Sequence, residues 1–330
     1  MKIITIKSIK KSLYRLFLVS VTSVLIVSCG ENQPISVAHH PWPGYELIDL
    51  YQSLVPESRK HFNIIRTQDS KESISLLESG QVDAAALTMD EALTVKEAGT
   101  DIKVVLIFDI SAGADVVIGN NSFSEPHQLV NKRIAYTPGP LSMLILTKFF
   151  ESSEALGWDN VELLPVGSSE HQSVIEEGRA EAVVTYPPAS RQLILDNKNI
   201  LFDSSGMPNL IFDVLAVRES SLNFSNRHHI KNLINAHFEG RQHFISNPQD
   251  ASFRLSQKFG LPAQEVINTY RGLLLPDSRE NHRLLGGSSP QIQRYATEIV
   301  EVLSSHGLIS PTVSTSDLFT DQYLPTELNH

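Results

Sequence analysis

The sequence contains a single cysteine, Cys29, among its 330 residues. One thiol excludes an intrachain disulfide, and it excludes the cysteine clusters that hold zinc or iron-sulfur groups. Because no cysteine follows Cys29, the body of the chain has no sulfur nucleophile. We therefore expect neither a disulfide framework nor thiol catalysis.

Recognisable catalytic motifs are also missing. The chain has no Gly-x-Ser-x-Gly elbow, no phosphate loop ending in Lys-Ser or Lys-Thr, no dinucleotide-binding glycine pattern and no His-Glu-x-x-His pair. The adjacent pairs His39-His40 and His228-His229 are not ready-made chelates, because neighbouring side chains point apart on a strand and diverge by about 100° on a helix. We expect most of the 12 histidines at the surface. The sequence thus predicts a protein that is not an enzyme and holds no metal and no cofactor.

No hydrophobic run is long enough for a comfortable membrane span. The mostly apolar residues 16–27 number 12, whereas a spanning helix needs about 20. Basic residues precede this run, and Ile26-Val-Ser-Cys29 resembles the bacterial lipobox, in which the signal is cut before a lipidated cysteine. We expect a signal peptide at residues 1–28, then lipidated Cys29 and a spacer to residue 33. An ordinary secretory signal with a chance cysteine is the alternative.

Positive charge is scarce in the predicted mature protein. The chain has 27 basic and 37 acidic residues. Residues 1–28 hold five of the basic residues and no acidic one, so the remainder carries a net charge of −15. Such a surface repels nucleic acid and anionic bilayers. We expect no nucleic-acid partner, and contact with the membrane through the lipid anchor only.

Alternating strand and helix signals predict an α/β fold. Short runs rich in β-branched residues are typical of strands, and apolar residues at helical spacing separate them. Strands and helices that alternate in this way form parallel sheets with helices on both faces. The first expected strands lie at residues 35–39, 62–67 and 82–87, and the first expected helices at 46–54 and 69–78.

An internal repeat indicates two similar lobes. Residues 75–84 read Ser-Leu-Leu-Glu-Ser-Gly-Gln-Val-Asp-Ala, and residues 173–182 read Ser-Val-Ile-Glu-Glu-Gly-Arg-Ala-Glu-Ala. Both copies place a helix end, a glycine suited to the left-handed position, an acidic residue and a short strand in the same order. Chance convergence is the alternative, because helix-glycine-strand units are common in α/β proteins.

Residues 108–119 are the predicted first passage between the lobes. The small residues from Ser111 to Ala114 lie between two β-branched runs, which suits a place where the backbone approaches a ligand or changes its dihedral angles. An ordinary loop is the alternative. The run at 210–217 is the predicted return passage, and 115–119 is the predicted first hinge strand. The expected lobe I comprises residues 34–112 and 214–330, and the expected lobe II residues 113–213.

Further elements complete both lobes. Lobe II is expected to contain strands at residues 132–136, 161–166, 182–185 and 200–203, and a helix at 141–151. The last part of the chain is expected to be helical at 230–246, 248–259, 262–274 and 291–305, followed by a loosely packed tail at 310–330.

Loops after the strands carry the candidate ligand-binding residues, because parallel α/β sheets bind ligands at the carboxyl ends of their strands. Helix N-termini there offer free N–H groups, and aromatic rings can stack on a planar or cationic group. The loops contain several carboxylates and neither Lys nor Arg. This favours a neutral polar, heteroaromatic or amine-bearing ligand over a bare anion, although Asp90 could be only a helix cap. The candidates are His40, Trp42, Tyr45, Thr88, Asp90, Asp109, Ser111, Gly113, Thr137, Gly139 and Tyr186.

Five segments, in this order, resemble the substrate-binding lipoproteins of ABC importers in the nitrate, sulfonate and taurine group, which includes NMT1/THI5-like proteins. The segments are Trp42-Pro-Gly-Tyr45, Gly80-Gln-Val-Asp-Ala-Ala, Gly113-Ala-Asp115-Val-Val-Ile, Gly178-Arg-Ala-Glu-Ala-Val-Val-Thr-Tyr186 and Asp213-Val-Leu-Ala-Val-Arg218. The resemblance implies a type II periplasmic-binding fold, with two doubly wound α/β lobes joined by two crossover strands. It also implies a small-molecule ligand, an ABC permease partner in the inner membrane and a monomer. The cleft positions that it carries over are Trp42, Tyr45, Thr88, Asp109, Gly113, Thr137, Gly139 and Tyr186.

The leading hypothesis is an exported, lipid-anchored solute-binding protein in the cell envelope, on the periplasmic face of a membrane. One alternative is a ligand-sensing lipoprotein that docks on a membrane sensor kinase or cyclase. Another is a pyrimidine-synthesis enzyme like THI5, in which His40 would take the role of the family's active-site histidine.

Overall fold

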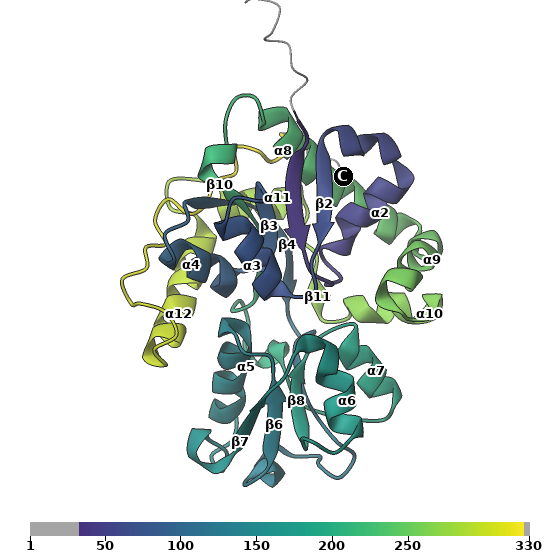
Figure 1. Cartoon of the computed structure of the whole chain (residues 1–330), viewed down its shortest axis with the longest axis vertical. Helices are drawn as coiled ribbons and strands as arrows, with labels where there is room; N and C mark the ends of the chain where they lie inside the picture. Colours follow the sequence, from purple (N-terminus) through teal and green to yellow (C-terminus); the bar gives the residue numbers. More distant parts are fainter. Residues whose placement is uncertain (1–32, 327–330) are drawn as a thin grey trace, which may run out of the picture. The chain divides into compact units, whose positions relative to one another are not determined.

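The structure is a computed structural model, and it describes residues 33–326. The predicted signal peptide and the predicted lipidation of Cys29 lie outside the described residues. Residues from Pro34 onward form one compact unit. Within it, two sheets with helices packed around them confirm the predicted α/β class (Figure 1). In the described range, we find no helix with the length and apolar character that a membrane crossing requires.

The first lobe is built on a six-stranded sheet. Its strands are β1 Ile35–His39, β2 Phe62–Arg66, β3 Ala84–Thr88, β4 Ile102–Ser111, β10 Phe212–Arg218 and β11 Leu273–Leu274. Their order across the sheet is β11-β4-β10-β3-β1-β2. Strand β1 pairs in parallel with β2 and β3, whereas β10 runs antiparallel between β3 and β4. Its helices are α2 Glu46–Leu54, α3 Ser70–Glu78, α4 Met89–Glu97, α8 Arg227–Ser246, α9 Pro248–Phe259, α10 Ala263–Val266, α11 Ser278–Leu285 and α12 Gln291–Ser305.

The second lobe repeats this plan with five strands. These are β5 Val116–Gly119, β6 Arg133–Tyr136, β7 Glu162–Pro165, β8 Ala182–Thr185 and β9 Asn199–Asp203, with helices α5 Pro140–Glu151, α6 His171–Glu176 and α7 Ala189–Leu195. The order is β7-β6-β8-β5-β9. Here β5 is the antiparallel strand, between β8 and β9. Each sheet therefore contains one reversed strand, β10 or β5, that enters directly after a passage from the other lobe, and β11 is a second reversed strand at the edge of the first sheet.

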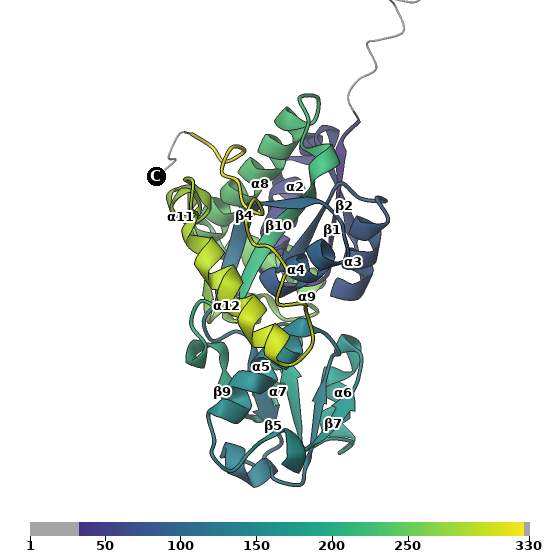
Figure 2. The same cartoon turned by 90° about the vertical axis from the view of Figure 1, so that its left-hand side faces the viewer.

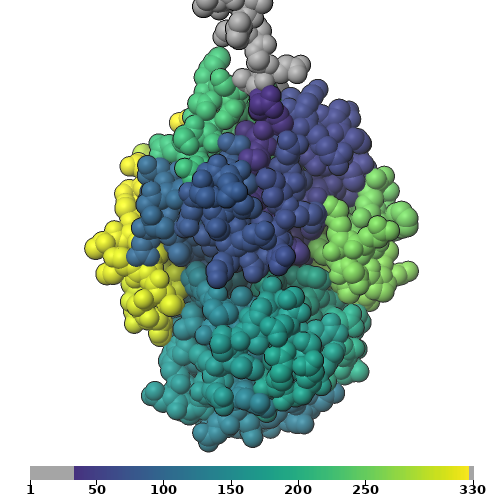
Figure 3. Space-filling view, viewed as in Figure 1, coloured from purple at the N-terminus to yellow at the C-terminus, as the bar shows by residue number. Residues whose placement is uncertain are grey.

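Two passages join the lobes, as the fold class predicts, but the expected hinge strand at 115–119 is mostly β5 of the second sheet, and the expected return passage at 210–217 is mostly β10 of the first sheet. Residues 112–115 lead from β4 into β5, and residues 204–211 lead from β9 into β10. The expected boundary at residue 213 falls inside β10, which begins at Phe212. In the space-filling view of Figure 3, the surfaces of the first lobe (purple and blue) and of the second lobe (teal) meet along their common boundary.

The repeated segments occupy equivalent places in the two sheets. Gly80 and Gly178 follow α3 and α6 with φ of 72° and 67°. The acid that follows has the same role in both copies: Asp83 accepts a hydrogen bond from the backbone N–H of Ser36 at 2.8 Å, and Glu181 accepts one from that of Arg133 at 2.9 Å. Each acid thus holds the start of the neighbouring parallel strand: Asp83 holds β1, and Glu181 holds β6. Shared geometry of this kind argues for a repeated unit and against chance convergence.

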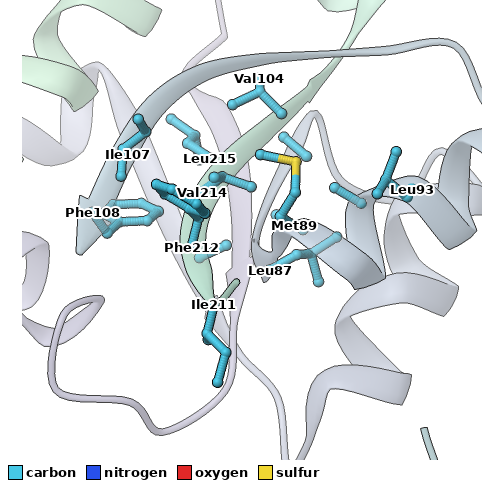
Figure 4. Packing of buried hydrophobic residues seen from close by; sticks show 14 of the residues in the cluster. Leu87, Met89, Leu93, Val104, Ile107, Phe108, Ile211, Phe212, Val214 and Leu215 are labelled. Atoms are coloured by element: carbon cyan, nitrogen blue, oxygen red, sulfur yellow. The ribbon is translucent and has the colours of Figure 1, made fainter. Parts of the chain in front are cut away.

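The reversed strand β10 lies at the centre of the core of the first lobe. Figure 4 shows Val214 and Leu215 of β10 beside Phe108 of β4 and Leu87 of β3. All four side chains are fully buried. Because β10 is covered on both faces, it reads as a continuous apolar run interrupted only by Asp213. Asp213 is the one acidic residue in this buried strand, and it belongs to the candidate site.

Two expectations about the last part of the chain are wrong. The predicted helix at 262–274 is broken, because Gly272 adopts φ of 80° and its backbone packs against that of Gly113, after which β11 pairs with the end of β4. The tail is not loosely packed: Leu318 and Leu324 are buried, and the backbone N–H of Val104 donates to the Leu318 carbonyl at 2.7 Å. Figure 2 shows this segment after α12, which runs beside α4 and α5.

Candidate functional site

A pocket lies where the carboxyl ends of strands from both sheets meet. Its cavity volume is about 40 Å³, which is smaller than the roughly 300–1,000 Å³ of most small-molecule sites. The first lobe contributes the ends of β1 and β3 and the start of β10, and the second contributes the crossover and the segments after β6 and β8. The lining residues are His40, Trp42, Ser70, Thr88, Glu91, Asp115, Thr137, Pro138, Gly139, Leu141, Ser142, Tyr186 and Asp213.

Two aromatic side chains form one wall of this pocket. The rings of Trp42 and Tyr186 come from different lobes and meet edge to face, with centroids 5.9 Å apart. The indole N–H of Trp42 donates to the carboxyl of Asp109 at 3.0 Å, so only the ring of Trp42 is available to a ligand. Gly44 permits this arrangement, because a Cβ at that position would lie 1.7 Å from Oδ2 of Asp109. The Trp-Pro-Gly-Tyr motif thus orients the wall through a buried acid.

Three acidic side chains also line the pocket. Glu91, Asp115 and Asp213 line the pocket, and each is at most 5% exposed. Burial raises the pKa of Asp115 to about 7, and it raises the pKa values of Glu91 and Asp213 as well. Both carboxyl oxygens of Asp115 and one of Asp213 have no hydrogen-bond partner among the described residues. Neither Lys nor Arg lines the pocket.

Supporting contacts fix two of these acids. The hydroxyl of Tyr45 donates to Asp213, and Tyr45 itself is fully buried beneath the pocket. The carboxylate of Glu91 accepts the backbone N–H of Thr88 at 2.9 Å, at the start of α4. These contacts occupy one oxygen of each acid, and the remaining oxygen of Asp213 is buried.

Buried histidines at this site are neutral, and they belong to the five of the 11 described histidines that are buried, whereas the other six are partly or fully exposed. Burial lowers the pKa of His40 to about 3 and that of His171 to about 4. His40 lines the pocket, and its Nδ1 has no partner among the described residues. His171 bridges the hydroxyls of Thr137 and Thr185, at 2.8 and 3.1 Å. It therefore orients Thr137 from behind.

The two passages between the lobes are tied to each other beside the pocket. The hydroxyls of Ser111 and Ser204 are 2.7 Å apart, and the hydroxyl of Ser204 also accepts the N–H of Gly113 at 2.6 Å. Gly113 has φ of 126°, and a Cβ on Gly272 would lie 2.4 Å from its carbonyl carbon. Ser111 and Gly113 thus belong to the hinge and do not line the pocket.

The candidate residues therefore fall into four groups. Tyr45 and Asp109 lie behind pocket residues, Asp90 is buried in the first turn of α4, and Ser111 and Gly113 lie in the hinge. Those that the structure brings together around the pocket are His40, Trp42, Thr88, Thr137, Gly139 and Tyr186.

Sequence reasoning missed the acids Glu91, Asp115 and Asp213 as lining residues. Their signals were present, since Asp115 and Asp213 each adjoin or interrupt an apolar strand, and Glu91 is the third residue of a Thr-x-x-Glu capping pattern. The other lining residues that it missed are Ser70, Pro138, Leu141 and Ser142.

Two groups of side chains outside the pocket have metal-ligating atoms close together. His61, His228 and His229 place ring nitrogens within 4.8 Å of one another, at the amino end of β2. The second group, His39 with Glu46 and Asp49, is an ion-pair network, because Arg66 and Lys258 bind both of its carboxylates. Neither group lines the pocket.

Known proteins share this architecture. The family model described as NMT1/THI5 like matches residues 61–251. No curated protein sequence matches the chain. The periplasmic aliphatic sulphonate binding protein SsuA from Escherichia coli superposes with a TM-score of 0.69 at 12% identity, over 87% of this chain and 97% of that one.

Two further solved structures also superpose on this chain. The alkanesulfonate-binding protein SsuA from Xanthomonas axonopodis pv. citri, bound to MOPS, gives a TM-score of 0.68 at 15% identity, over 85% of this chain and 96% of that one. The periplasmic nitrate-binding protein NrtA from Synechocystis PCC 6803 gives 0.67 at 10% identity, over 86% and 84%. The chain thus has the two-lobe fold of periplasmic binding proteins.

Proposed function

The chain belongs to the NMT1/THI5-like family, and from that premise we propose that it is an exported solute-binding protein of an ABC import system. The observation that carries the proposal is the pocket lined by both lobes beside two tied passages. A ligand there contacts both lobes at once, so its binding favours the arrangement in which they meet. The similar solved structures include proteins named for binding sulphonates and nitrate, which supports a transport role.

The proposal includes the route to the envelope. Residues 1–28 direct export, Cys29 carries the lipid, and the globular monomer is tethered at the periplasmic face of a membrane. An ABC permease in the inner membrane then receives the solute. The basic and apolar N-terminal sequence and its Val-Ser-Cys end support this part. Replacement of Cys29 by alanine should move the protein from the membrane fraction to the soluble fraction, with loss of the acyl mass at the N-terminus.

Capture without chemical change is the proposed activity. The neighbouring structures are named as binding proteins, and His40 is neutral because burial lowers its pKa to about 3. A neutral imidazole orients a ligand by hydrogen bonding and supplies no proton at neutral pH. A ligand recovered unchanged after prolonged incubation supports binding, whereas a modified ligand would indicate the enzyme alternative.

The decisive experiment is a thermal-shift screen of the full-length chain in detergent against amines, pyrimidines, amino acids, sulfonates and nitrate. We expect one class to raise Tm, and we expect Trp42→Ala and Tyr186→Ala to remove that increase relative to each variant's own Tm. Trp158→Ala is the matched control, because Trp158 packs on Phe150 at a ring distance of 4.8 Å and does not line the pocket. Shifts that persist in both pocket variants would contradict the site.

Co-purification separates transport from sensing. A permease recovered with the tagged full-length chain supports import. A sensor kinase or cyclase in its place, together with unimpaired growth on the solute after deletion, would contradict it.

A further inference from the structure

Three separate elements bring acidic side chains to the pocket. Glu91 comes from α4, Asp115 from the first crossover and Asp213 from β10, and all three are buried. Two more buried acids, Asp90 and Asp109, stand behind them. Since neither Lys nor Arg lines the pocket, this wall has no cation of its own.

Two of the acids that line the pocket have buried carboxyl oxygens without a hydrogen-bond partner among the described residues. Both oxygens of Asp115 and Oδ2 of Asp213 have no hydrogen-bond partner among the described residues. Buried polar atoms in proteins are almost always paired, and buried charges are paired with opposite charges. These atoms therefore identify positions that a ligand with hydrogen-bond donors would fill.

Elsewhere, the same chain neutralises the acids that it buries. Glu46 and Asp49 are 1% and 8% exposed. Arg66 forms ion pairs with both at 2.7 and 2.6 Å, and Lys258 adds a third contact to Asp49 at 2.6 Å. Among the described residues, the lack of Arg or Lys partners for the buried acids is therefore specific to the pocket.

The positive ends of helices at the pocket do not offset its excess of acidic side chains. A helix N-terminus carries about half a positive charge. At α4 that charge is already met by Glu91, which accepts the N–H of Thr88. The N-terminus of α5, at Gly139 and Pro140, is the opposing contribution, and it is small beside three carboxyl groups.

A metal ion does not fit these acids. Among the described residues, the carboxylates of the pocket are not a group whose ligand atoms all lie within 4.8 Å of one another, as one coordination sphere would need. Donors spread over a larger molecule can reach acids on separate elements. The ring wall of Trp42 and Tyr186 then supplies a surface on which an organic cation is attracted to the aromatic faces.

We infer that the pocket binds a small organic cation whose ammonium, amidinium, guanidinium or protonated ring nitrogen contacts Asp115 and Asp213. The inference rests on the proposed solute-binding function and names its ligand class. It sets this chain apart from the neighbours that are named for sulphonates and nitrate.

The test is a charge series on the full-length chain in detergent, by thermal shift and then by calorimetric titration. The cations are benzamidine, choline and putrescine, the neutral probe is benzamide, and the anions are benzoate, methanesulfonate and nitrate. We expect at least one cation to raise Tm and every anion to leave it unchanged. Asp115→Asn, which keeps the shape and removes the charge, should raise the Kd of that cation at least tenfold. The exposed Asp159 of the second lobe provides the control Asp159→Asn, with an unchanged Kd.

The outcomes separate this inference from the proposed function. An anion or benzamide that raises Tm in the wild type but not in Trp42→Ala would overturn the cation inference and leave solute binding intact. A cation whose Kd is the same in Asp115→Asn would overturn it too. If no compound of any charge bound, the proposed solute-binding function itself would fail.

Discussion

Replacement of Asp115 by asparagine should make the empty protein more stable at alkaline pH. The side chain is 1% exposed, and neither of its carboxyl oxygens has a partner among the described residues. Burial, with a further contribution from the charge of Glu91, raises its pKa from 3.8 to about 7. The folded protein therefore holds a proton on Asp115 that the unfolded chain has already released.

The sign and the size follow from proton linkage. Because the folded pKa is the higher one, the stability is fully present below the unfolded pKa near 4 and is lost as pH rises toward 7. Each pH unit in that window costs about 1.4 kcal/mol, so the total loss is about 4 kcal/mol, with about 3 kcal/mol of it between pH 5 and pH 8. Asparagine cannot ionise, so the variant should escape this loss.

Urea unfolding of the full-length chain, followed by far-UV circular dichroism at pH 5 and pH 8, measures the effect. The free energy of unfolding of the wild type should fall by about 3 kcal/mol more than that of Asp115→Asn between the two pH values. Asp159→Asn should follow the wild type, because Asp159 is exposed. An equal fall in Asp115→Asn and the wild type would refute the reasoning, since it would mean that Asp115 is ionised at no cost in the folded state.

The other predictions concern the pocket wall, the hinge and the ligand. Gly44→Ala should lower Tm and weaken ligand binding, because its Cβ would lie 1.7 Å from Oδ2 of Asp109; thermal unfolding and calorimetry measure both. Gly272→Ala should lower the free energy of unfolding by about 2 kcal/mol or more, because its Cβ would meet the Gly113 carbonyl carbon at 2.4 Å and its φ is 80°. Gly157→Ala, where a Cβ meets nothing within 4 Å, is the control for both, and equal Tm values in all three variants would contradict the packing argument. The Kd of a bound cation should fall as pH rises from 6 to 8, by at most about tenfold per pH unit for each carboxyl that loses a proton; a pH-independent Kd in calorimetry would exclude this coupling.

Much of the fold follows from local sequence signals. Strand β1 and helices α2, α9 and α12 begin and end as predicted, because apolar periodicity and the Asn-Pro and Gly-Leu-Pro junctions act within a few residues. The broken helix after Pro262 was missed because its cause is distant. Gly272 bends where its backbone meets Gly113, and no pattern within the segment records that contact.

The candidate site divides in the same way. Residues in loops after strands, such as Trp42 and Thr137, could be found from topology alone, and they line the pocket. The acids Asp115 and Asp213 were missed although each adjoins or interrupts an apolar strand, because only the assembled sheets bring these positions to the pocket. Conversely, the hydroxyl of Ser111 is of a type that could contact a ligand, but it hydrogen-bonds with the hydroxyl of Ser204 in the hinge.

Asp115 and Asp213 hold corresponding positions in the two lobes, and this links specificity to closure. Asp213 lies near the start of β10, opposite Thr88 at the end of β3, and Asp115 directly precedes β5, whose first residue pairs with Thr185 at the end of β8. Each acid thus stands where the chain enters a lobe beside the hinge. When the lobes meet around an empty pocket, both acids lose water without gaining a partner, which opposes closure. A cation that contacts both removes that cost only in the closed arrangement, and a ligand shifts a conformational equilibrium by the difference in its affinity for the two states. The same unpaired oxygens that select a cation would therefore make closure depend on its presence.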